Sequence, residues 1–333
     1  MSLFPYGGEP LTNLGLVKHV VDYARRKEGW NPHFHLDTNG TLMNEEVARF
    51  LADNDFFLQI SLDGPQSIHD RYRVFADGRG TFETALRNIK ALKKLAPDYF
   101  RKVCLSATSA PPGDLVAIDK FFCDEFEDNM TQLIYVNPYD TVFFERCREE
   151  VSSDVLQRTN DQLLDQYIAL RADSKVARIP GIKQELVEKA VIRIHSRRSE
   201  FLSDVVSPPG ICLPGSRRTF VTCDGRFFPC ERVGEQGVFQ IGDVDEGISY
   251  DRVRRLIEEF ISVSSRVCLD CWAQRICSDC YGFARKGDSV SLDRKKESCS
   301  STLRHLDRAL VAYASIMERN LHAFDFVKDM VHS

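Results

Sequence analysis

The sequence has no long hydrophobic run and no excess of basic residues. None of its apolar stretches approaches the roughly 18–20 residues of a membrane-spanning helix. The first residues, from Met1 to Tyr6, contain neither the basic region nor the apolar core of a secretory signal peptide. The net charge is −5, so no overall positive field is available to hold nucleic acid or anionic lipid. These absences predict a cytoplasmic protein with no membrane and no nucleic-acid partner.

Internal repeats and low-complexity tracts are also absent. Hydrophobic residues make up 43% and charged residues 28% of the chain, which excludes a collagen-like or wholly disordered protein. The 333 residues allow two or three domains.

Short apolar segments alternate with amphipathic ones in the first part of the chain. This alternation predicts a parallel sheet with helices outside it, in an α/β fold. We count about five strand–helix units, too few to close an eight-stranded barrel. The strands are expected near residues 3–6, 33–36, 56–61, 103–108 and 133–136, and the helices near 16–24, 44–53, 82–95 and 115–126, with Asn44 as a helix cap.

Cysteine is scarce before residue 200 and abundant after it. Only Cys104, Cys123 and Cys147 come early, each in apolar surroundings, and we expect them in the core. Without a secretion signal, clustered cysteines are more often metal ligands than disulfides. The other eight lie within 88 residues, at positions Cys212, Cys223, Cys230, Cys268, Cys271, Cys277, Cys280 and Cys299.

The spacing of these cysteines favours more than one metal site. Two residues separate Cys268 from Cys271, which lets both thiolates face one centre from a tight turn. A hairpin around Gly225 would bring Cys230 to the same region. Seven or eight thiols exceed one four-ligand site, so two iron–sulfur clusters fit this count better than one zinc ion with spare cysteines, and two zinc ions remain an alternative. Cys223 is expected to be a buried non-ligand on a strand.

Turn residues follow the predicted strands, where α/β barrels place their chemistry. Gly7-Gly8-Glu9-Pro10 allows a ligand to approach the backbone closely, and Glu9 could accept a hydrogen bond from an ammonium group. A strand-end hydroxyl at Ser61 could bind a ribose, and the planar fork of Arg73 suits a carboxylate. Taken singly, these residues are equally compatible with a plain turn, a surface salt bridge at Arg73 and loop packing at His69.

Several motifs occur in order at the ends of successive strands. They are Gly7-Gly8-Glu9-Pro10, Thr38-Asn39-Gly40-Thr41-Leu42, Ile60-Ser61-Leu62-Asp63-Gly64-Pro65 with His69-Asp70 and Arg73, and Gly80-Thr81-Phe82. Together they resemble the radical S-adenosylmethionine (SAM) superfamily, and the later cysteines resemble its SPASM extension, which holds auxiliary 4Fe–4S clusters. The most similar members are peptide maturases of ribosomally made precursors, with the anaerobic sulfatase maturases as their sister group.

The resemblance implies a partial (β/α) barrel of the radical SAM type. Residues 1–150 would form the barrel, 151–209 a helical linker or insertion, 210–300 the SPASM domain and 301–333 a C-terminal helix. Gly7, Gly8 and Glu9 would contact the amino group of SAM, Ser61 its ribose and Arg73 its carboxylate.

The same resemblance assigns the cysteines to two auxiliary clusters. The ligands would be Cys212, Cys230 and Cys280 for the first, and Cys268, Cys271, Cys277 and Cys299 for the second. Glu231, directly after a cluster cysteine, would be a catalytic base. The chain departs from the family pattern in two ways. Two residues separate Cys277 from Cys280, where three are usual. The first cluster has no evident fourth ligand, so that position would be filled by Cys223 or left open.

The family's CxxxCxxC motif, which binds the SAM-cleaving cluster, is absent because no cysteine precedes Cys104. The sequence therefore predicts an N-terminally truncated chain, with an exposed apolar sheet edge and with that third cluster only in the full-length protein.

The full-length enzyme would form a 5′-deoxyadenosyl radical, abstract a substrate hydrogen and pass an electron to the auxiliary clusters. Its expected partners are a precursor peptide, which gains a thioether cross-link, and an electron donor such as flavodoxin or ferredoxin. Oxidation of a sulfatase Cys or Ser to formylglycine is one alternative. A non-catalytic metal-binding or peptide-binding module is another.

Overall fold

The computed structural model describes residues 2–110, 113–135, 153–173, 178–197, 208–210, 212–235 and 237–327. The chain forms two compact units, residues 1–186 (unit 1) and 187–333 (unit 2). Among the helices of these described ranges, none is both long and apolar enough to cross a membrane. Cys147 lies outside the described residues, so its expected place in the core stays a prediction.

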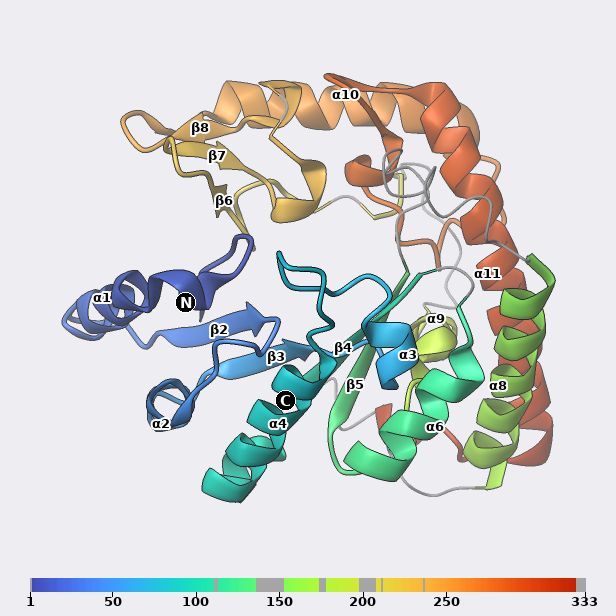
Figure 1. Ribbon diagram of the computed structural model, residues 1–333. Helices are drawn as coiled ribbons and strands as arrows, with labels where there is room; N and C mark the ends of the chain where they lie inside the picture. Colours follow the sequence, from blue (N-terminus) through green and yellow to red (C-terminus); the bar gives the residue numbers. More distant parts are fainter. Residues whose placement is uncertain are drawn as a thin grey trace. The chain divides into compact units, whose positions relative to one another are not determined.

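Unit 1 contains a five-stranded sheet in which every neighbouring pair is parallel, in the order β1-β2-β3-β4-β5 (Figure 1). Because the strands are parallel, their carboxyl ends meet at one edge, where the predicted motifs follow them. The α/β fold class predicted from the sequence is confirmed. The strands are β1 (Ser2–Leu3), β2 (His33–Thr38), β3 (Phe57–Ser61), β4 (Cys104–Ser109) and β5 (Met130–Tyr135).

The helices of unit 1 follow the strands in alternation, and α2, α4 and α6 run along the outside of the sheet (Figure 1). Asn44 caps α2 as predicted, since its side chain accepts a hydrogen bond from Val47 N at 2.9 Å. The helices are η1 (Pro10–Asn13), α1 (Leu14–Arg25), α2 (Glu45–Asp53), α3 (Gln66–His69), α4 (Phe82–Leu95), α5 (Pro97–Phe100), α6 (Leu115–Phe126), α8 (Ser153–Asp173) and η3 (Lys183–Leu186).

The core of unit 1 lies between the sheet and these helices. Leu36, Leu58 and Leu105 on the three central strands are at most 1% exposed. Each buried leucine contributes about 1.5–3 kcal/mol relative to an exposed one. At the outer strand β1, by contrast, Phe4 and Tyr6 are exposed.

Two early cysteines lie in different surroundings. Cys104 is buried on β4, as expected. The expectation of an apolar site is wrong for Cys123, which is half-buried with its sulfur 3.4 Å from Lys183 Nζ. Lys183 also forms a buried ion pair with Asp119 at 2.7 Å. The helical spacing of Asp119 and Cys123 on α6 places both side chains beside this lysine.

The described residues of unit 2 form a four-stranded antiparallel sheet, a two-stranded one, three α-helices and short 3-10 helices. The four-stranded sheet, in the order β6-β7-β8-β9, packs against α10 through a buried core that includes Phe228, Phe239 and Phe260. The elements of unit 2 are α9 (Glu188–His195), β6 (Phe220–Val221), β7 (Arg226–Phe228), η4 (Glu231–Val233), η5 (Gly237–Phe239), β8 (Gly242–Asp243), β9 (Gly247–Ile248), α10 (Tyr250–Cys268), η6 (Tyr281–Ala284), β10 (Arg285–Lys286), β11 (Ser289–Val290) and α11 (Leu292–Arg319).

Two expectations about unit 2 are wrong in detail. The long helix α11 begins before Cys299, at Leu292, and ends at Arg319 because Asn320 adopts an extended backbone. Phe324, predicted on that helix, is buried beyond its end. Cys223 is exposed rather than buried, because β6 ends at Val221 and Cys223 lies in the turn that leads to β7. The four-part division of the chain stays a prediction.

Candidate functional site

Glu9 joins the turn after β1 to the end of β2. Its Oε1 accepts hydrogen bonds from Leu11 N at 3.0 Å and from Thr38 Oγ1 at 2.9 Å, and its Oε2 accepts one from Asn39 N at 2.8 Å. The carboxylate therefore caps η1 and fixes two adjacent turns. A carboxylate offers about four lone-pair positions, so a further donor can still bind there.

A cavity of about 570 Å³ lies beside this turn and is lined by residues of β1, η1 and α1, including Gly7, Gly8 and Glu9. Its volume falls in the range of about 300–1,000 Å³ that is common for small-molecule sites. A Cβ atom at Gly7 or Gly8 would meet no atom within 4 Å. Packing within the chain therefore does not require glycine here, and the open space is available to a ligand.

Ser61 is the last residue of β3 and is half-buried at the carboxyl edge of the sheet. It pairs in register with Ser106 of β4. The structure thus places Ser61 at the predicted strand end.

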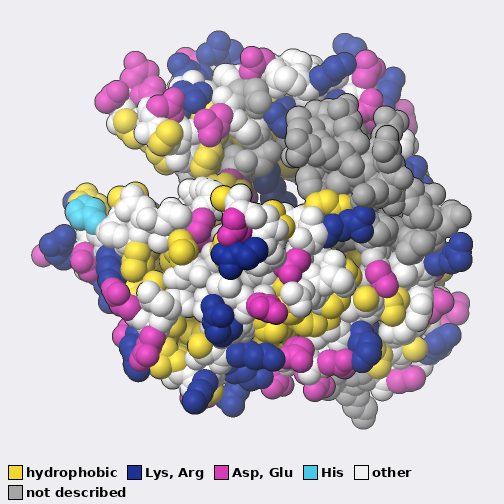
Figure 2. Space-filling view, in the orientation of Figure 1, with side chains coloured by type: hydrophobic (Ala, Val, Ile, Leu, Met, Phe, Trp, Pro, Cys, Tyr) yellow, Lys and Arg dark blue, Asp and Glu magenta, His cyan; other side chains and the backbone are white. Residues whose placement is uncertain are grey.

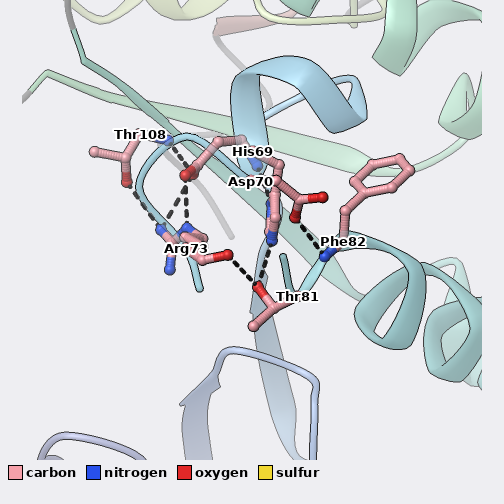
Figure 3. A network of polar contacts seen from close by, with 7 residues as sticks. His69, Asp70, Arg73, Thr81, Phe82 and Thr108 are labelled. Atoms are coloured by element: carbon pink, nitrogen blue, oxygen red, sulfur yellow. Dashed lines mark hydrogen bonds and ion pairs between the residues drawn. The ribbon is translucent and has the colours of Figure 1, made fainter. Parts of the chain in front are cut away.

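Arg73 is held by Asp63, which follows β3. Its Nε and Nη2 donate to Oδ2 and Oδ1 of Asp63 at 2.6 and 3.1 Å, and Nη2 also donates to Thr108 Oγ1 at 3.3 Å (Figure 3). The Asp63 side chain is only 7% exposed, so this two-pronged ion pair is largely buried and is not the surface salt bridge considered from the sequence. Because Nε and Nη2 face Asp63, Nη1 is the nitrogen left for another acceptor.

His69 is a buried, neutral link in the same network (Figure 3). Its Nδ1 accepts a hydrogen bond from Asp63 N at 3.2 Å. Nε2 then carries the proton and donates to Thr81 Oγ1 at 3.0 Å, and Thr81 Oγ1 donates to the carbonyl of Arg73. Burial lowers the pKa of His69 to about 4, which keeps this tautomer neutral. The loop-packing interpretation of His69 fits these contacts.

In unit 2, four cysteines line one small cavity. They are Cys268 at the end of α10, Cys271 and Cys277 in the segment that follows, and Cys299 on α11, and the cavity measures about 20 Å³. This is the set predicted for the second cluster. Within the described ranges, no three His, Cys, Asp or Glu side chains are drawn together as a metal site.

Three thiols of this four-thiol group have raised pKa values, which favours their protonated form in the absence of metal. Burial raises the pKa of Cys268 to about 11, and the cation of Lys295 opposes that shift. Burial likewise raises the pKa values of Cys277 and Cys299. Metal binding must therefore displace protons from these sulfurs.

Three other cysteines form a second group. Burial raises the pKa of Cys280, and the neighbouring Cys230 and Cys212 thiolates add to this shift. The sulfur of Cys212 lies 2.7 Å from the hydroxyl of the buried Tyr281. This three-thiol group is the set predicted for the first cluster.

Sequence reasoning missed two buried charges beside the four-thiol group. Asp279, between Cys277 and Cys280, accepts hydrogen bonds from Ser298 at 2.8 Å and from Thr302 at 2.9 Å. Lys295 lines the cavity, with Nζ 3.8 Å from Asp279. The helical interval of four between Lys295 and Cys299 was the available signal.

Glu231 is the first residue of η4, directly after Cys230. Its carboxylate is 19% exposed and lies 3.3 Å from Arg218 Nη1. It is thus a half-buried, paired group near the three-thiol group in sequence.

Charged side chains of both signs are interspersed on the described surface drawn in Figure 2. The mixture agrees with the small net charge of −5.

Comparison with known proteins relates part of unit 1 to a family. The Radical SAM superfamily model matches residues 3–108. Over 96 residues the chain is 35% identical to a cysteine-type anaerobic sulfatase-maturating enzyme of Clostridium novyi, covering 28% of this chain and 26% of that one. It is 31% identical over 149 residues to the enzyme of the same name from Clostridium perfringens, covering 44% and 39%. The matched part thus spans well under half the length of these relatives.

A radical SAM cyclopropyl synthase, TigE of Paramaledivibacter caminithermalis, is 26% identical over 94 residues, covering 28% of this chain and 19% of that one. The solved structure of anSMEcpe with bound AdoMet superposes with a TM-score of 0.66 at 21% identity, covering 96% of this chain and 84% of that one. The structural likeness extends the shared fold beyond the matched sequence. Residues 3–108 of this chain thus match the Radical SAM superfamily.

Proposed function

We propose that this chain is part of a radical SAM enzyme that modifies a peptide substrate, and that unit 2 holds two auxiliary 4Fe–4S clusters. The observation that carries the proposal is the four-thiol group around one cavity, in a chain whose residues 3–108 match the radical SAM family. When bound, SAM and the clusters supply the radical chemistry and take up electrons, which side chains cannot do.

The residues of unit 1 fit SAM as a ligand. Glu9 would accept a hydrogen bond from its amino group, with Gly7 and Gly8 leaving room beside the 570 Å³ cavity. Ser61 would bind the ribose, and Nη1 of Arg73 would bind the carboxylate. Asp63 fixes the orientation of the guanidinium that this contact needs.

The residues of unit 2 fit iron–sulfur clusters, because thiolate sulfur is their usual protein ligand. Cys268, Cys271, Cys277 and Cys299 would hold one cluster, and Cys212, Cys230 and Cys280 the other. Glu231 would take up the proton that the substrate releases, since it directly follows Cys230 of the three-thiol group. An electron donor such as flavodoxin or ferredoxin would supply the reducing equivalents.

Within this class, we favour a thioether cross-link in a ribosomally made precursor peptide. The sulfatase-maturating relatives support a second candidate, the oxidation of Cys or Ser to formylglycine. Mass spectrometry of the peptide product separates the two. A thioether cross-link loses two hydrogens and leaves one cysteine that a thiol-alkylating reagent no longer labels. Formylglycine made from cysteine loses the sulfur, and formylglycine made from serine loses two hydrogens but leaves every cysteine open to alkylation.

Iron and labile sulfide counts on the anaerobically reconstituted chain test the cluster proposal directly. We expect about eight irons and as much sulfide per chain, and about four after Cys271→Ala. Zinc without labile sulfide in the wild-type chain would contradict the proposal.

A further inference from the structure

Lys295 is the least expected residue beside the four-thiol group. Its side chain is 1% exposed, and its Nζ has no hydrogen-bond partner within the part of the chain that the structure describes. A buried ammonium group without hydrogen bonds costs several kcal/mol. A lysine in this state indicates that something is still to be bound at its amino group.

The surroundings of Lys295 direct this charge toward the cavity. Lys295 and Cys299 are one turn apart on α11, and both line the same cavity as Cys268, Cys271 and Cys277. Nζ also lies 3.8 Å from Asp279 and 5.8 Å from the centre of the Phe260 ring.

Asp279 only partly compensates this cation. Its carboxylate is already shared between the hydroxyls of Ser298 and Thr302, at 2.8 and 2.9 Å, both on the same face of α11. Asp279 thus positions Lys295 without forming a hydrogen bond with it. The ammonium therefore retains capacity to donate to a second acceptor.

We infer that Lys295 is a positioning and redox-tuning residue, whose ammonium group donates to a sulfur of the cluster bound by the four-thiol group. The inference rests on the proposed function. Four thiolates outweigh the positive charge of a 4Fe–4S core, and each added electron makes the cluster more negative. A fixed cation in a dry site favours the reduced state, because charge and hydrogen bonds at the sulfurs set the reduction potential.

The test is an EPR-monitored redox titration of the anaerobically reconstituted full chain, with dithionite as reductant. Wild type is compared with Lys295→Met, which removes the charge, and with Lys295→Arg, which keeps it. Lys296→Met is the matched control, since Lys296 is the next residue on α11 and is exposed. The signal that Cys271→Ala abolishes identifies the four-thiol cluster.

In Lys295→Met, we expect the equilibrium constant for reduction of this cluster to fall about tenfold, or about 59 mV for a one-electron couple. The other cluster and the Lys296→Met control should keep wild-type potentials. An unchanged potential in Lys295→Met, with iron content intact, would overturn the inference.

Loss of the cluster from Lys295→Met leaves Lys295→Arg as the decisive variant. Retention of the cluster there supports the role of the charge, and loss from both variants contradicts it. If wild-type protein binds no iron and sulfide at all, the proposed function fails instead, so the two failures are distinct.

Discussion

The guanidinium of Arg73 lies against the carboxylate of Asp63, with two hydrogen bonds of 2.6 and 3.1 Å. Asp63 follows β3 and also accepts a hydrogen bond from the backbone of Thr108 on β4, at 2.8 Å. The arginine of a loop is thereby fixed to the ends of two neighbouring strands. A side chain held in this way can present one free nitrogen in a constant direction.

Arg73→Lys should lower the free energy of unfolding by about 1–2 kcal/mol, because lysine cannot replace the two-pronged contact to buried Asp63. Urea unfolding measures the change. Arg79→Lys is the control, since Arg79 pairs with Asp77 at an exposed site and should change stability by less than about 0.5 kcal/mol. If Arg73→Lys and Arg79→Lys change the free energy of unfolding equally, the Arg73–Asp63 ion pair has no special structural role.

His69 should make stability depend on pH. Its pKa is lowered from 6.5 to about 4 in the fold, so the unfolded chain binds a proton in this interval and the folded chain does not. The contribution of His69 to the free energy of unfolding is therefore fully present above about pH 6.5. It falls by about 3 kcal/mol in all as the pH decreases toward 4.

His69→Asn removes this titration. The difference in free energy of unfolding between wild type and the variant should therefore become smaller as the pH is lowered from 7 to 4.5. Urea unfolding at each pH measures this difference. His19→Asn, at an exposed position on α1, is the matched control. A constant difference for His69→Asn would show that the histidine does not titrate as described.

Cys223 and Cys230 should differ in their effect on iron binding. Cys223 is exposed in the hairpin turn, whereas Cys230 lies near Cys212 and Cys280. We expect Cys223→Ala to keep the full complement after reconstitution and Cys230→Ala to lose about four irons per chain. A comparable loss from Cys223→Ala would instead identify Cys223 as the missing fourth ligand of the three-thiol group.

Asp279→Asn should destabilise unit 2 by about 2–4 kcal/mol even without metal, because it leaves the buried Lys295 without its anion. The midpoint of thermal unfolding of the metal-free chain reports the loss. Asp307→Asn, at an exposed position on α11, should have little effect. If both variants unfold at the wild-type temperature, the buried pair does not stabilise the unit.

The strand–helix alternation of unit 1 could be predicted from sequence, because the apolar periods differ clearly between its strands and helices. Helix α4 (Phe82–Leu95) has the predicted bounds, and it buries Phe82, Ala85, Ile89 and Leu92. The start of α11 could not be predicted, since Leu292 is followed by charged residues with no apolar period. Ser291, whose side chain accepts a hydrogen bond from Arg294 N, is the local cap that begins it.

The candidate site was only partly predictable. The resemblance to the SPASM extension named the members of the four-thiol group, whereas the cysteine spacing alone indicated only clustered metal ligands. The burial of Lys295 and its distance from Asp279 depend on how α11 packs against the Cys277–Cys280 segment. Residue order alone does not contain that information, and neither does it show that Arg73 is bound by Asp63.

Cys277 and Cys280 belong to different thiol groups, yet only Ser278 and Asp279 separate them. With both groups filled as proposed, this short tether makes their occupancies thermodynamically linked. Cluster binding at one thiol group would lower the entropic cost of ordering the other thiol group. Chains that hold only one cluster should therefore be rarer than independent binding predicts.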